Sequence, residues 1–399
     1  MNLLFINNAE VSPFSNGIQR VTHLLSQAFA AEGINCYSAF YFDNPATEKT
    51  PFTIKLKLQH GQEYEVLSRF IADNKIKFII CQEVLGNKRL FKNIRRAAAN
   101  SCKLLYCLHT TPLSAFVSPN TAAEFFRILH KNQILRSLKK LTVGLLPHFA
   151  YNWLVFRQKR KEFSILNECF DRIVLLSEKY IDDWRTVSAL PANDRHKVIA
   201  IPNALVFDAA ISDKDLDKKQ HEILIVARLS DRQKRISTAL QIWEKAQQNV
   251  DVKNWKLTIL GTGEDEAYYK HLVKKYKIKA ISFDGVQNPI EYYRRASIFM
   301  MTSAYEGFPM TLIEAQQMGA VPILFNNFGA AHDIVEKDFS GIIIEKDNFE
   351  EYMNQLIMLM CNTEKLQILA KNAIESCKQF STENIVSKWI ELFNTYLTK

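Results

Sequence analysis

Short apolar runs alternate with amphipathic segments along most of the chain. Residues 3–6 form an apolar run of the kind found in a strand buried on both faces. Apolar residues then recur over positions 18–29 at helical spacing, until Gly33 interrupts the pattern. Further strands are predicted at residues 36–42, 78–81, 104–108 and 173–176, each separated from the next by room for a helix. The alternation predicts an α/β fold with parallel sheets covered by helices on both faces.

Residues 299–325, FMMTSAYEGFPMTLIEAQQMGAVPILF, combine this alternation with a turn that could hold a ligand. The apolar run 299–302 predicts a strand, and the helical spacing that follows predicts a helix ending at Gly319. Pro309 suits the first helical turn because its missing N–H would have no partner there. We therefore expect the amides of Met310 and Thr311 to point out of a helix N-terminus, where an anion can bind.

The same turn carries groups that suit a sugar nucleotide. Gly307 has no Cβ, so a ligand can approach the backbone. Glu306 lies in the turn, and Glu314 lies on the helix, on the same face as Thr311. Two carboxylates near an anion site would repel a phosphate unless they were set back from it, so we expect them to accept hydrogen bonds from neutral hydroxyls, as on sugar rings. As a bare spacing, two glutamates eight positions apart could also be coincidence.

Length and composition indicate two globular domains. The chain has 399 residues, 47% hydrophobic and 23% charged. Its seven cysteines, an odd number spread singly through apolar segments such as Cys81, Cys107 and Cys361, predict buried thiols in a reducing compartment. The amino terminus has no basic start and too brief an apolar run for a signal peptide, so we expect a cytoplasmic protein. The net charge of +9 favours anionic partners: nucleotide phosphates, an anionic membrane face or nucleic acid.

The string Glu-Gly-Phe-Pro, the apolar helix with the second Glu, and Gly-Ala-Val-Pro-Ile closely resemble the donor-site signature of glycosyltransferase family four, within glycosyl transferases group 1. The resemblance spans nearly the whole chain and is strongest over residues 198–345. It implies the GT-B fold, two facing Rossmann-like domains. The implied domains are an acceptor-binding domain at 1–200 with an insertion at 121–163, a donor-binding domain at 201–382, and a C-terminal helix at 383–399 that crosses back to the first domain.

The resemblance implies a retaining enzyme that moves a sugar from a nucleoside-diphosphate sugar to a glycan or lipid-linked acceptor, in cell-surface polysaccharide biosynthesis. No metal or other cofactor is expected, because fixed cations can stabilise the departing diphosphate. Asp213-Lys214-Asp215 has a metal-binding spacing, but it lies in a polar, lysine-rich linker and is interpreted as solvated.

The resemblance assigns the roles in sugar transfer to particular residues. Arg228 and Lys234, with the amides of Met310 and Thr311, would stabilise the diphosphate, while Glu306 orients sugar hydroxyls and Glu314 binds the ribose. The resemblance also assigns to the donor site Gly17, Gly261, Gly263, Val286, Gly307, Phe308 and Pro309.

The match departs from the family pattern at two places. Asn16-Gly17 stands where the family usually has two adjacent glycines, and an ordinary helix start capped by Asn16 explains it equally well. The spacing from Arg228 to Lys234 is one residue longer than usual, and Arg235 occupies a common glycine position. Arg232 or Arg235 could substitute for Lys234, and a basic solvent loop is the other interpretation of this stretch.

His109 directly follows the strand predicted at 104–108. Ligands collect at the carboxyl ends of parallel strands, although a lone histidine is more often structural. The family often carries a histidine here that contacts the donor sugar. The resemblance therefore implies that His109 is a hydrogen-bond donor near the reacting carbon.

Residues 121–163 depart from the alternating pattern. Residues 141–156 are apolar and aromatic, and basic residues flank them on both sides: Lys139, Lys140, Arg157, Lys159, Arg160 and Lys161. The run falls short of the roughly 20 apolar residues that span a bilayer. Two interpretations remain open, which do not exclude each other: residues 139–161 lie on an anionic membrane surface, as a protein peripheral on the inner face would, or they pack on the amino-terminal domain beside the acceptor.

Two other functions compete with sugar transfer. A non-catalytic nucleotide-sugar-binding or scaffold protein would keep the turn at 302–309 without turnover. Nucleic-acid binding through the basic surface is not expected, because the sequence has no recognisable recognition motif.

Overall fold

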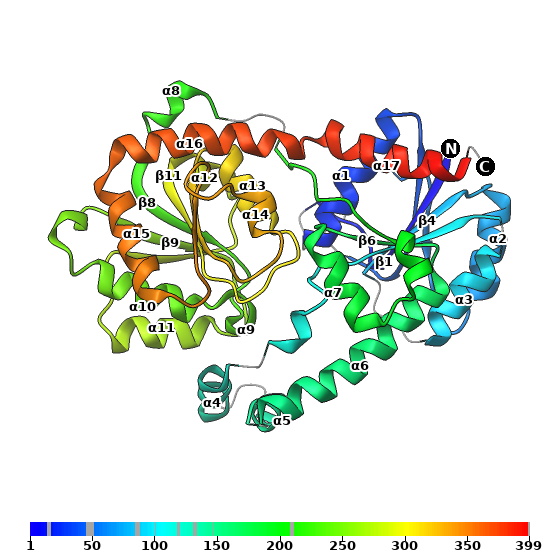
Figure 1. Ribbon diagram of the computed structural model, residues 1–399, viewed down its shortest axis with the longest axis horizontal. Coiled ribbons are helices and arrows are strands. Elements are labelled where there is room, and N and C mark those ends of the chain that lie inside the picture. The colour runs from blue at the N-terminus through cyan, green and yellow to red at the C-terminus, as the bar shows by residue number, and fades with distance from the viewer. Residues whose placement is uncertain are drawn as a thin grey trace. The chain divides into compact units, whose positions relative to one another are not determined.

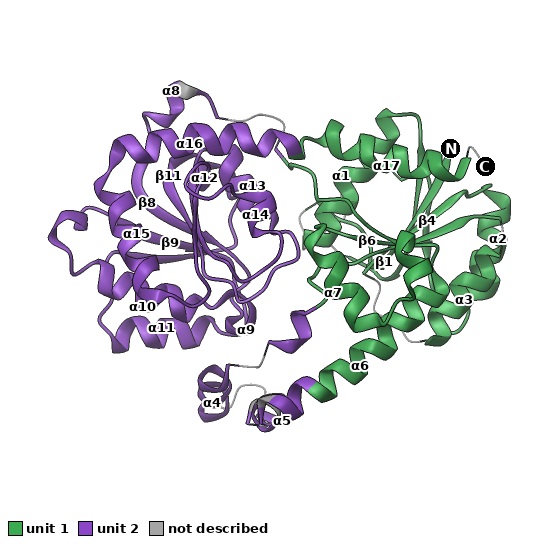
Figure 2. Cartoon of the chain, in the orientation of Figure 1, with its two compact units in different colours: residues 1–112, 153–206, 380–399 green, residues 113–152, 207–379 purple. Residues whose placement is uncertain are grey.

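The computed structural model describes residues 1–13, 17–44, 52–83, 88–99, 101–117, 120–130, 134–145, 147–207 and 211–397 (Figure 1). The chain forms two compact α/β units, coloured separately in Figure 2. Unit 1 comprises residues 1–112, 153–206 and 380–399, and unit 2 comprises residues 113–152 and 207–379. The predicted α/β class with parallel sheets is confirmed in both units.

Unit 1 contains a seven-stranded parallel sheet in the order β3-β2-β1-β4-β5-β6-β7. Its strands are β1 (Asn2–Ala9), β2 (Asn35–Phe42), β3 (Lys55–Lys57), β4 (Phe78–Gln82), β5 (Lys103–Cys107), β6 (Arg172–Leu175) and β7 (Val198–Ala200). Its helices are α1 (Gly17–Ala31), α2 (Glu63–Asp73), α3 (Lys88–Ala98), α7 (Lys179–Ser188), α17 (Thr382–Leu397) and most of α6 (His148–Cys169).

The five predicted strands of this unit are confirmed, because each is an apolar run that lies buried in the sheet. Leu3, Leu4, Phe5 and Ile6 of β1, for example, are completely buried. Sequence reasoning missed β3 and β7. Each is only three residues long and lies at an edge of the sheet, so neither carries a periodic signal.

The last helix, α17, belongs to unit 1 although the residues just before it belong to unit 2. Phe29 of α1 packs edge-on against Trp389 and Phe393 of α17. Phe393 also contacts Phe78 of β4, with 4.6 Å between the ring centroids. The carboxyl-terminal residues therefore complete the core of the first unit.

Unit 2 contains a six-stranded parallel sheet in the order β10-β9-β8-β11-β12-β13. Its strands are β8 (Gln220–Val226), β9 (Lys256–Leu260), β10 (Ile281–Gly285), β11 (Ala296–Met301), β12 (Val321–Phe325) and β13 (Ile342–Ile344). Its helices are α4 (Thr121–Leu129), α5 (Ile134–Gly144), α8 (Asp213–Leu216), α9 (Asp231–Lys234), α10 (Ile236–Ala246), α11 (Glu266–Lys275), α12 (Ile290–Arg295), α13 (Met310–Gln317), α14 (Ala331–Ile334), α15 (Phe349–Cys361) and α16 (Thr363–Cys377).

The strand order of unit 2 reverses between β8 and β11. From β8 the chain continues to β9 and β10 on one side, whereas β11 and the later strands lie on the other. In open parallel sheets, ligands bind beyond the carboxyl ends of the strands at such a reversal. The loops at residues 227–230 and 302–309, which follow β8 and β11, occupy that position.

The placement of the insertion differs from the expected one. Sequence analysis put residues 121–163 in the first domain, whereas residues 113–152 group with unit 2. Only the part of the segment from Trp153 onward belongs to unit 1.

All seven cysteines are free, and six are buried. Burial raises the pKa of the Cys102 thiol to about 11, so a buried thiol of this kind stays protonated at neutral pH. The expectation of a buried thiol is wrong for Cys361, which is exposed at the end of α15.

Two glycines allow the loops after β8 and β9 to touch backbone to backbone. The Leu229 N–H donates to the Thr262 carbonyl over 2.9 Å. A Cβ on Gly261 would lie 1.9 Å from the Ala227 carbonyl oxygen, and a Cβ on Gly263 would lie 2.3 Å from that of Leu229. Gly261 also has a φ of +122°, which L side chains rarely adopt.

We predict that Gly261→Ala lowers the free energy of unfolding of unit 2 by about 3 kcal/mol, because it adds backbone strain and forces the two loops apart. Gly17→Ala is the matched control, since nothing lies within 4 Å of the added Cβ. Thermal unfolding followed by circular dichroism measures both. Equal melting temperatures for the two variants would contradict the close approach.

Candidate functional site

The site is built where the loop after β8 and α9 meet the loop after β11. The Ala304 N–H donates to the Gln233 carbonyl over 2.7 Å. The Thr302 hydroxyl donates to the carbonyls of Lys234 and Arg235, at 3.1 and 3.0 Å. These bonds fix the two loops to each other through the backbone, so the side chains they carry share one geometry.

Three predicted site residues are joined by a fourth that was not predicted. The Lys234 ammonium lies 2.6 Å from Oε1 of Glu306. Gln233 donates from Nε2 to the other oxygen of Glu306 over 3.2 Å, and its own Oε1 accepts from Arg228 over 3.2 Å. The hydrogen bonds therefore run from Arg228 through Gln233 and Glu306 to Lys234. No signal in the sequence singled out Gln233, which lies within a basic cluster.

Burial differs along this chain of contacts. The side chain of Glu306 is 6% exposed and that of Lys234 is 16% exposed, whereas Arg228 is exposed. Sequence analysis gave Lys234 to phosphate and Glu306 to sugar hydroxyls, but the structure pairs the two charges directly. A cation and a carboxylate in this arrangement can bind groups of opposite character side by side: an anion at Lys234 and Arg228, and a hydroxyl at Glu306.

Arg235 follows α9 in the left-handed conformation, with a φ of 50°. This conformation costs about 1–2 kcal/mol for a residue with a Cβ and costs glycine little. It gives a physical reason for the glycine that the resembled family often has at this position. The Arg235 guanidinium pairs with Asp347 at 2.6 Å, whereas Lys234 pairs with Glu306.

Glu314, which was predicted to bind the ribose, is completely buried on α13. Its Oε2 accepts a hydrogen bond from the Tyr293 hydroxyl over 3.0 Å. Tyr293 is also completely buried, and its ring packs near Phe207 and Phe299. In this structure the carboxylate therefore lies inside unit 2, and Tyr293 is a second partner that sequence reasoning missed.

The turn before α13 has nearly the predicted form. The strand β11 ends at Met301, and the helix begins at Met310. Pro309 stands just before the helix with an extended ψ of 109°, so it caps the helix and is not its first residue. Gly307, Phe308 and Met310 are buried, whereas Thr311 is partly exposed.

The other predicted donor residues lie on separate elements. Gly261 and Gly263 follow β9 and pack against the loop after β8. Val286 follows β10 and is 75% exposed. Gly17 is the first residue of α1 in unit 1, and Asn16 lies outside the described residues.

A buried network of charges supports the loop that carries Gln233 and Lys234. Asp231, at the start of α9, accepts hydrogen bonds from the backbone N–H and the hydroxyl of Ser237, at 2.9 and 2.7 Å. Its own N–H donates to Asp265 over 2.7 Å. Arg127 of α4 pairs with both Asp265 and Glu124, and these three side chains are at most 5% exposed.

Residues 113–152 hold this loop through further contacts. Asn120 donates to the Asp231 carboxylate. Arg232 donates to the carbonyls of Ala115 and Val117, with the shortest contact at 2.8 Å. Tyr151 donates to the Ala115 carbonyl over 2.6 Å. Arg232 is therefore engaged by the backbone of this segment.

His109 lies in unit 1, where it follows β5 as predicted. Its Nε2 lies 2.6 Å from Oε1 of Gln82, and its backbone N–H donates to Glu83 over 2.8 Å. The imidazole lines a small cavity together with Gln82, Asn203 and Trp389. Burial lowers the pKa of His109 to about 4, so the ring is neutral at pH 7 and can donate through one nitrogen.

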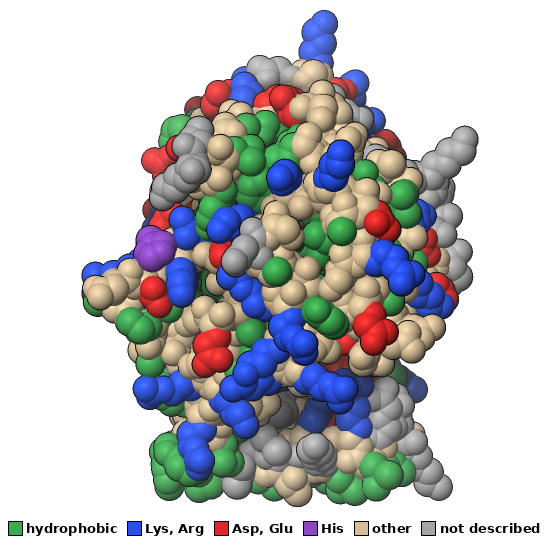
Figure 3. Space-filling model, turned by 90° about the vertical axis from the view of Figure 1, so that its right-hand side faces the viewer, with side chains coloured by type: hydrophobic (Ala, Val, Ile, Leu, Met, Phe, Trp, Pro, Cys, Tyr) green, Lys and Arg blue, Asp and Glu red, His purple; other side chains and the backbone are tan. Residues whose placement is uncertain are grey.

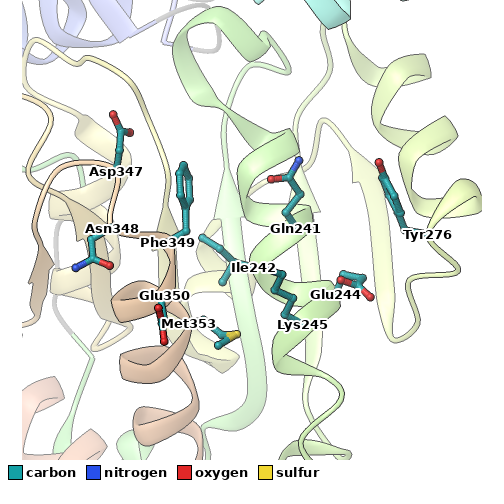
Figure 4. Close-up of a pocket in the computed structure, with 10 residues that line it drawn as sticks. All are labelled: Gln241, Ile242, Glu244, Lys245, Tyr276, Asp347, Asn348, Phe349, Glu350 and Met353. Atoms are coloured by element: carbon teal, nitrogen blue, oxygen red, sulfur yellow. The ribbon is translucent and has the colours of Figure 1, made fainter.

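A groove of about 800 Å³ on unit 2 is separate from these loops (Figure 4). It lies between α10 and the start of α15, where Phe349 and Met353 face Ile242, and it extends to Tyr276 after α11. None of its lining residues is one of the predicted site residues.

Within the described ranges, no group of three or more His, Cys, Asp or Glu side chains is placed to hold a metal ion. A search of the same residues finds no helix long and apolar enough to cross a membrane.

The comparisons with known proteins agree with this geometry. The family described as glycosyl transferases group 1 matches residues 206–376, which form most of unit 2. Unit 2 therefore matches this family over most of its length. The resemblance to the group 1 glycosyltransferases is thereby confirmed, and the predicted enzyme class agrees with it.

Two curated relatives are themselves named glycosyltransferases. The amylovoran biosynthesis glycosyltransferase AmsD of Erwinia amylovora is 32% identical over 44% of this chain and 49% of its own length. A UDP-Gal:alpha-D-GlcNAc-diphosphoundecaprenol alpha-1,3-galactosyltransferase of Escherichia coli is 25% identical over 59% of this chain and 60% of its own length. The matches thus span about half the length of these relatives.

Two solved structures show the same fold over nearly the whole chain. TarM of S. aureus superimposes with a TM-score of 0.71 at 12% identity, covering 99% of this chain and 100% of that one. HepE of Anabaena gives 0.70 at 14% identity, with the same coverage. The fold of the chain is therefore GT-B, as predicted.

We predict that Arg127→Met destabilises this group 1 domain by about 3–5 kcal/mol, because it leaves the buried carboxylates of Glu124 and Asp265 without their cation. Urea unfolding measures the loss. Arg294→Met in the same unit removes a solvent-exposed ion pair with Glu291 and should cost less than about 1 kcal/mol. Similar losses in both variants would show that the Arg127 network is not a buried one.

We predict that His109 makes stability depend on pH between about 6.5 and 4. The unfolded chain takes up a proton on this residue below its ordinary pKa of 6.5, whereas the folded chain does not do so until about pH 4. Stability should therefore fall as the pH falls through this window, by at most about 3 kcal/mol. The His109→Gln variant should lose this part of the slope in pH-dependent thermal unfolding, and His196→Gln, at an exposed histidine, should keep it.

Proposed function

We propose that the protein is a retaining glycosyltransferase that moves a sugar from a nucleoside-diphosphate sugar to a glycan or lipid-linked acceptor. The observation that carries the proposal is the linked set Arg228, Gln233, Glu306 and Lys234, which lies beyond the carboxyl ends of β8 and β11 in a group 1 domain. A strand-order reversal is where an open sheet binds its ligand, and this set supplies the charges that a sugar diphosphate needs.

The cations take the role of stabilising the leaving group. Charge develops on the diphosphate as the bond to the sugar breaks, and fixed cations are worth most where that charge appears. Arg228 is exposed and can turn toward a bound phosphate, while the ion pair with Glu306 holds Lys234 in place. The N-terminus of α13 adds backbone dipoles, with Met310 and Thr311 in its first turn. On this reading a metal ion is not required.

Glu306 has a second role in the proposal. Its two oxygens already accept from Lys234 and Gln233, which fixes the carboxylate in one orientation. When a diphosphate competes for the Lys234 ammonium, Glu306 retains the capacity to accept from a sugar hydroxyl. Glu314 would reach a ribose only after its bond to Tyr293 is exchanged, because the carboxylate is completely buried.

The first unit takes the acceptor in this proposal, and the neutral imidazole of His109 donates a hydrogen bond near the reacting carbon once its Nε2–H exchanges the Gln82 oxygen for a sugar oxygen. A neutral donor suits this position, because it can bind a sugar oxygen without pairing with the diphosphate.

The related proteins support the proposed substrate class and cellular location. The TarM and HepE structures are complexes with UDP, and the Escherichia coli relative is named for an undecaprenol-linked acceptor. We therefore propose UDP or another nucleoside diphosphate as the donor's carrier, cell-surface polysaccharide assembly as the process, and the cytoplasmic face of a membrane as the location.

The test is a thermal-shift panel of UDP, GDP, ADP and their common sugars. A nucleotide at about 100 times its dissociation constant should stabilise the folded protein by roughly 2.7 kcal/mol. Arg228→Gln should weaken binding of that nucleotide by roughly tenfold or more, since a charge-assisted hydrogen bond is lost. Lys270→Gln, which removes one exposed cation on α11, is the control and should bind normally. Absence of stabilisation by every nucleotide would refute the proposal.

Turnover separates the enzyme from a nucleotide-sugar-binding protein. With the nucleotide identified, release of that diphosphate from its sugar should be detectable, and Glu306→Gln should reduce the rate while leaving nucleotide binding within a fewfold of normal. Binding without any release of diphosphate, with or without a glycan acceptor, would favour the non-catalytic alternative.

A further inference from the structure

The positive charge of the chain is concentrated in one segment. Lys and Arg exceed Asp and Glu by 9 over all 399 residues. Residues 125–161 contain nine Lys or Arg and neither Asp nor Glu. The rest of the chain is therefore balanced, and the whole surplus belongs to these 37 positions.

The same segment carries an unusual share of exposed apolar side chains. Among the described residues, twenty large hydrophobic side chains are exposed, and nine of them lie between positions 125 and 154. Leu135 is 85% exposed, Phe149 is 78% exposed and Trp153 is 56% exposed. Single exposed apolar residues are ordinary, but such a concentration marks an interaction surface.

Some of these cations have a structural role and are not available to a partner. Arg127 is buried against Glu124 and Asp265. Lys140 and Arg136 both pair with Glu264 on the surface of unit 2, at 3.3 Å. Among the cations of this segment whose side chains the structure describes, Arg157, Arg160 and Lys161 of α6 remain exposed without a recorded ion pair.

The exposed side of α6 carries aromatic residues first and cations after them. Phe149, Trp153, Arg157 and Arg160 follow one another at intervals of four, four and three, so they share one face of the helix. All four side chains are exposed, and the Arg157 guanidinium lies 4.8 Å from the Trp153 ring centroid. We call the residues Phe149, Trp153, Leu154, Arg157, Arg160 and Lys161 the aromatic–cationic face.

The helix α3 extends the cationic surface within unit 1. It packs beside the residue that follows α6, with 5.7 Å between the rings of Phe91 and Phe170. Its exposed positions are Lys88, Arg89, Lys92 and Arg96, and the helix contains no acidic residue. Figure 3 shows Lys and Arg side chains gathered in the lower half of this side of the molecule, with hydrophobic side chains along its lower edge.

We propose that the aromatic–cationic face docks on an anionic lipid bilayer. Cations on α6 and α3 would contact lipid head groups, while Phe149, Trp153 and Leu154 would enter the interface between head groups and acyl chains. Nucleic acid would satisfy the cations but would leave the Leu and Phe side chains in water. A bilayer satisfies both kinds of group, and long Arg side chains can lie along its surface with their heads in water.

The bilayer surface deepens the proposed function, because a lipid-linked acceptor is found at a bilayer. Only the identity of the acceptor rests on the proposed function. The lipid surface itself follows from exposure and charge. Nucleotide binding and bilayer binding can therefore fail separately.

The experiment is co-sedimentation of the full-length protein with vesicles of phosphatidylcholine alone or mixed with phosphatidylglycerol, in about 0.1 M salt, where screening acts over about 10 Å. The protein should sediment with the anionic vesicles and remain in solution with the neutral ones. Replacing Arg157, Arg160 and Lys161 by Gln should lower the partition coefficient by roughly 100-fold, because each cation contributes about fivefold at an anionic surface. Replacing Lys253, Lys274 and Lys275, three exposed lysines of unit 2, removes the same charge and should leave it within about fivefold.

The apolar part of the face has its own variant. Phe149→Ala with Trp153→Ala keeps every cation and should still weaken anionic-vesicle binding by at least tenfold, since about 0.8 kcal/mol is lost for each methylene withdrawn from the interface. Melting temperature and nucleotide stabilisation should stay normal in both α6 variants, which shows that the fold and donor site are intact. Unchanged vesicle binding in the Phe149/Trp153 variant, or equal retention of wild-type protein by single-stranded DNA and by anionic vesicles, would overturn the proposal in favour of a general polyanion surface.

Discussion

The candidate site depends on one ion pair of low exposure between neighbouring loops, Lys234 with Glu306. An ion pair with little exposure is stable only if its geometry is fixed and its other hydrogen bonds are satisfied, because both charges have lost water. Here Gln233 binds the second oxygen of Glu306, and the two loops are joined by backbone hydrogen bonds at Ala304 and Thr302. The pair is therefore held by the sheet and not by the loops alone, which is what a site needs if its cation is to meet a developing negative charge without rearranging.

The supports of this pair come from distant parts of the sequence. Gly261 and Gly263 let the loop after β9 lie directly on the loop after β8, and Asp265 then accepts from the Asp231 backbone. Arg127, more than a hundred positions earlier, neutralises Asp265 from the other side. Residues 113–152 thus form part of the second unit in physical terms, although they interrupt the first unit in sequence.

Sequence reasoning located the elements that carry strong local signals. The buried strands of both units were predictable because unbroken apolar runs have few other uses, and the turn before α13 was predictable because Gly, Pro and Glu occupy definite positions in it. Sequence reasoning missed the residues whose role depends on a contact made only in the folded protein. Gln233 and Tyr293 are ordinary residues until the fold brings Glu306 and Glu314 to them, and Arg127 appears in the sequence as one more member of a basic stretch.

The same limit explains why the insertion at 121–163 could not be placed from its composition. Both of its open interpretations treated the basic residues as one group, but the structure divides them by partner. Arg127, Arg136 and Lys140 pair with carboxylates of unit 2, and two of these, Glu264 and Asp265, lie more than a hundred positions further along the chain. Arg157, Arg160 and Lys161 lie on α6 beside exposed aromatic residues. The helix α6 carries both kinds of residue, because Tyr151 in its first turn binds the Ala115 backbone of unit 2, whereas Arg157, Arg160 and Lys161 further along the helix are exposed.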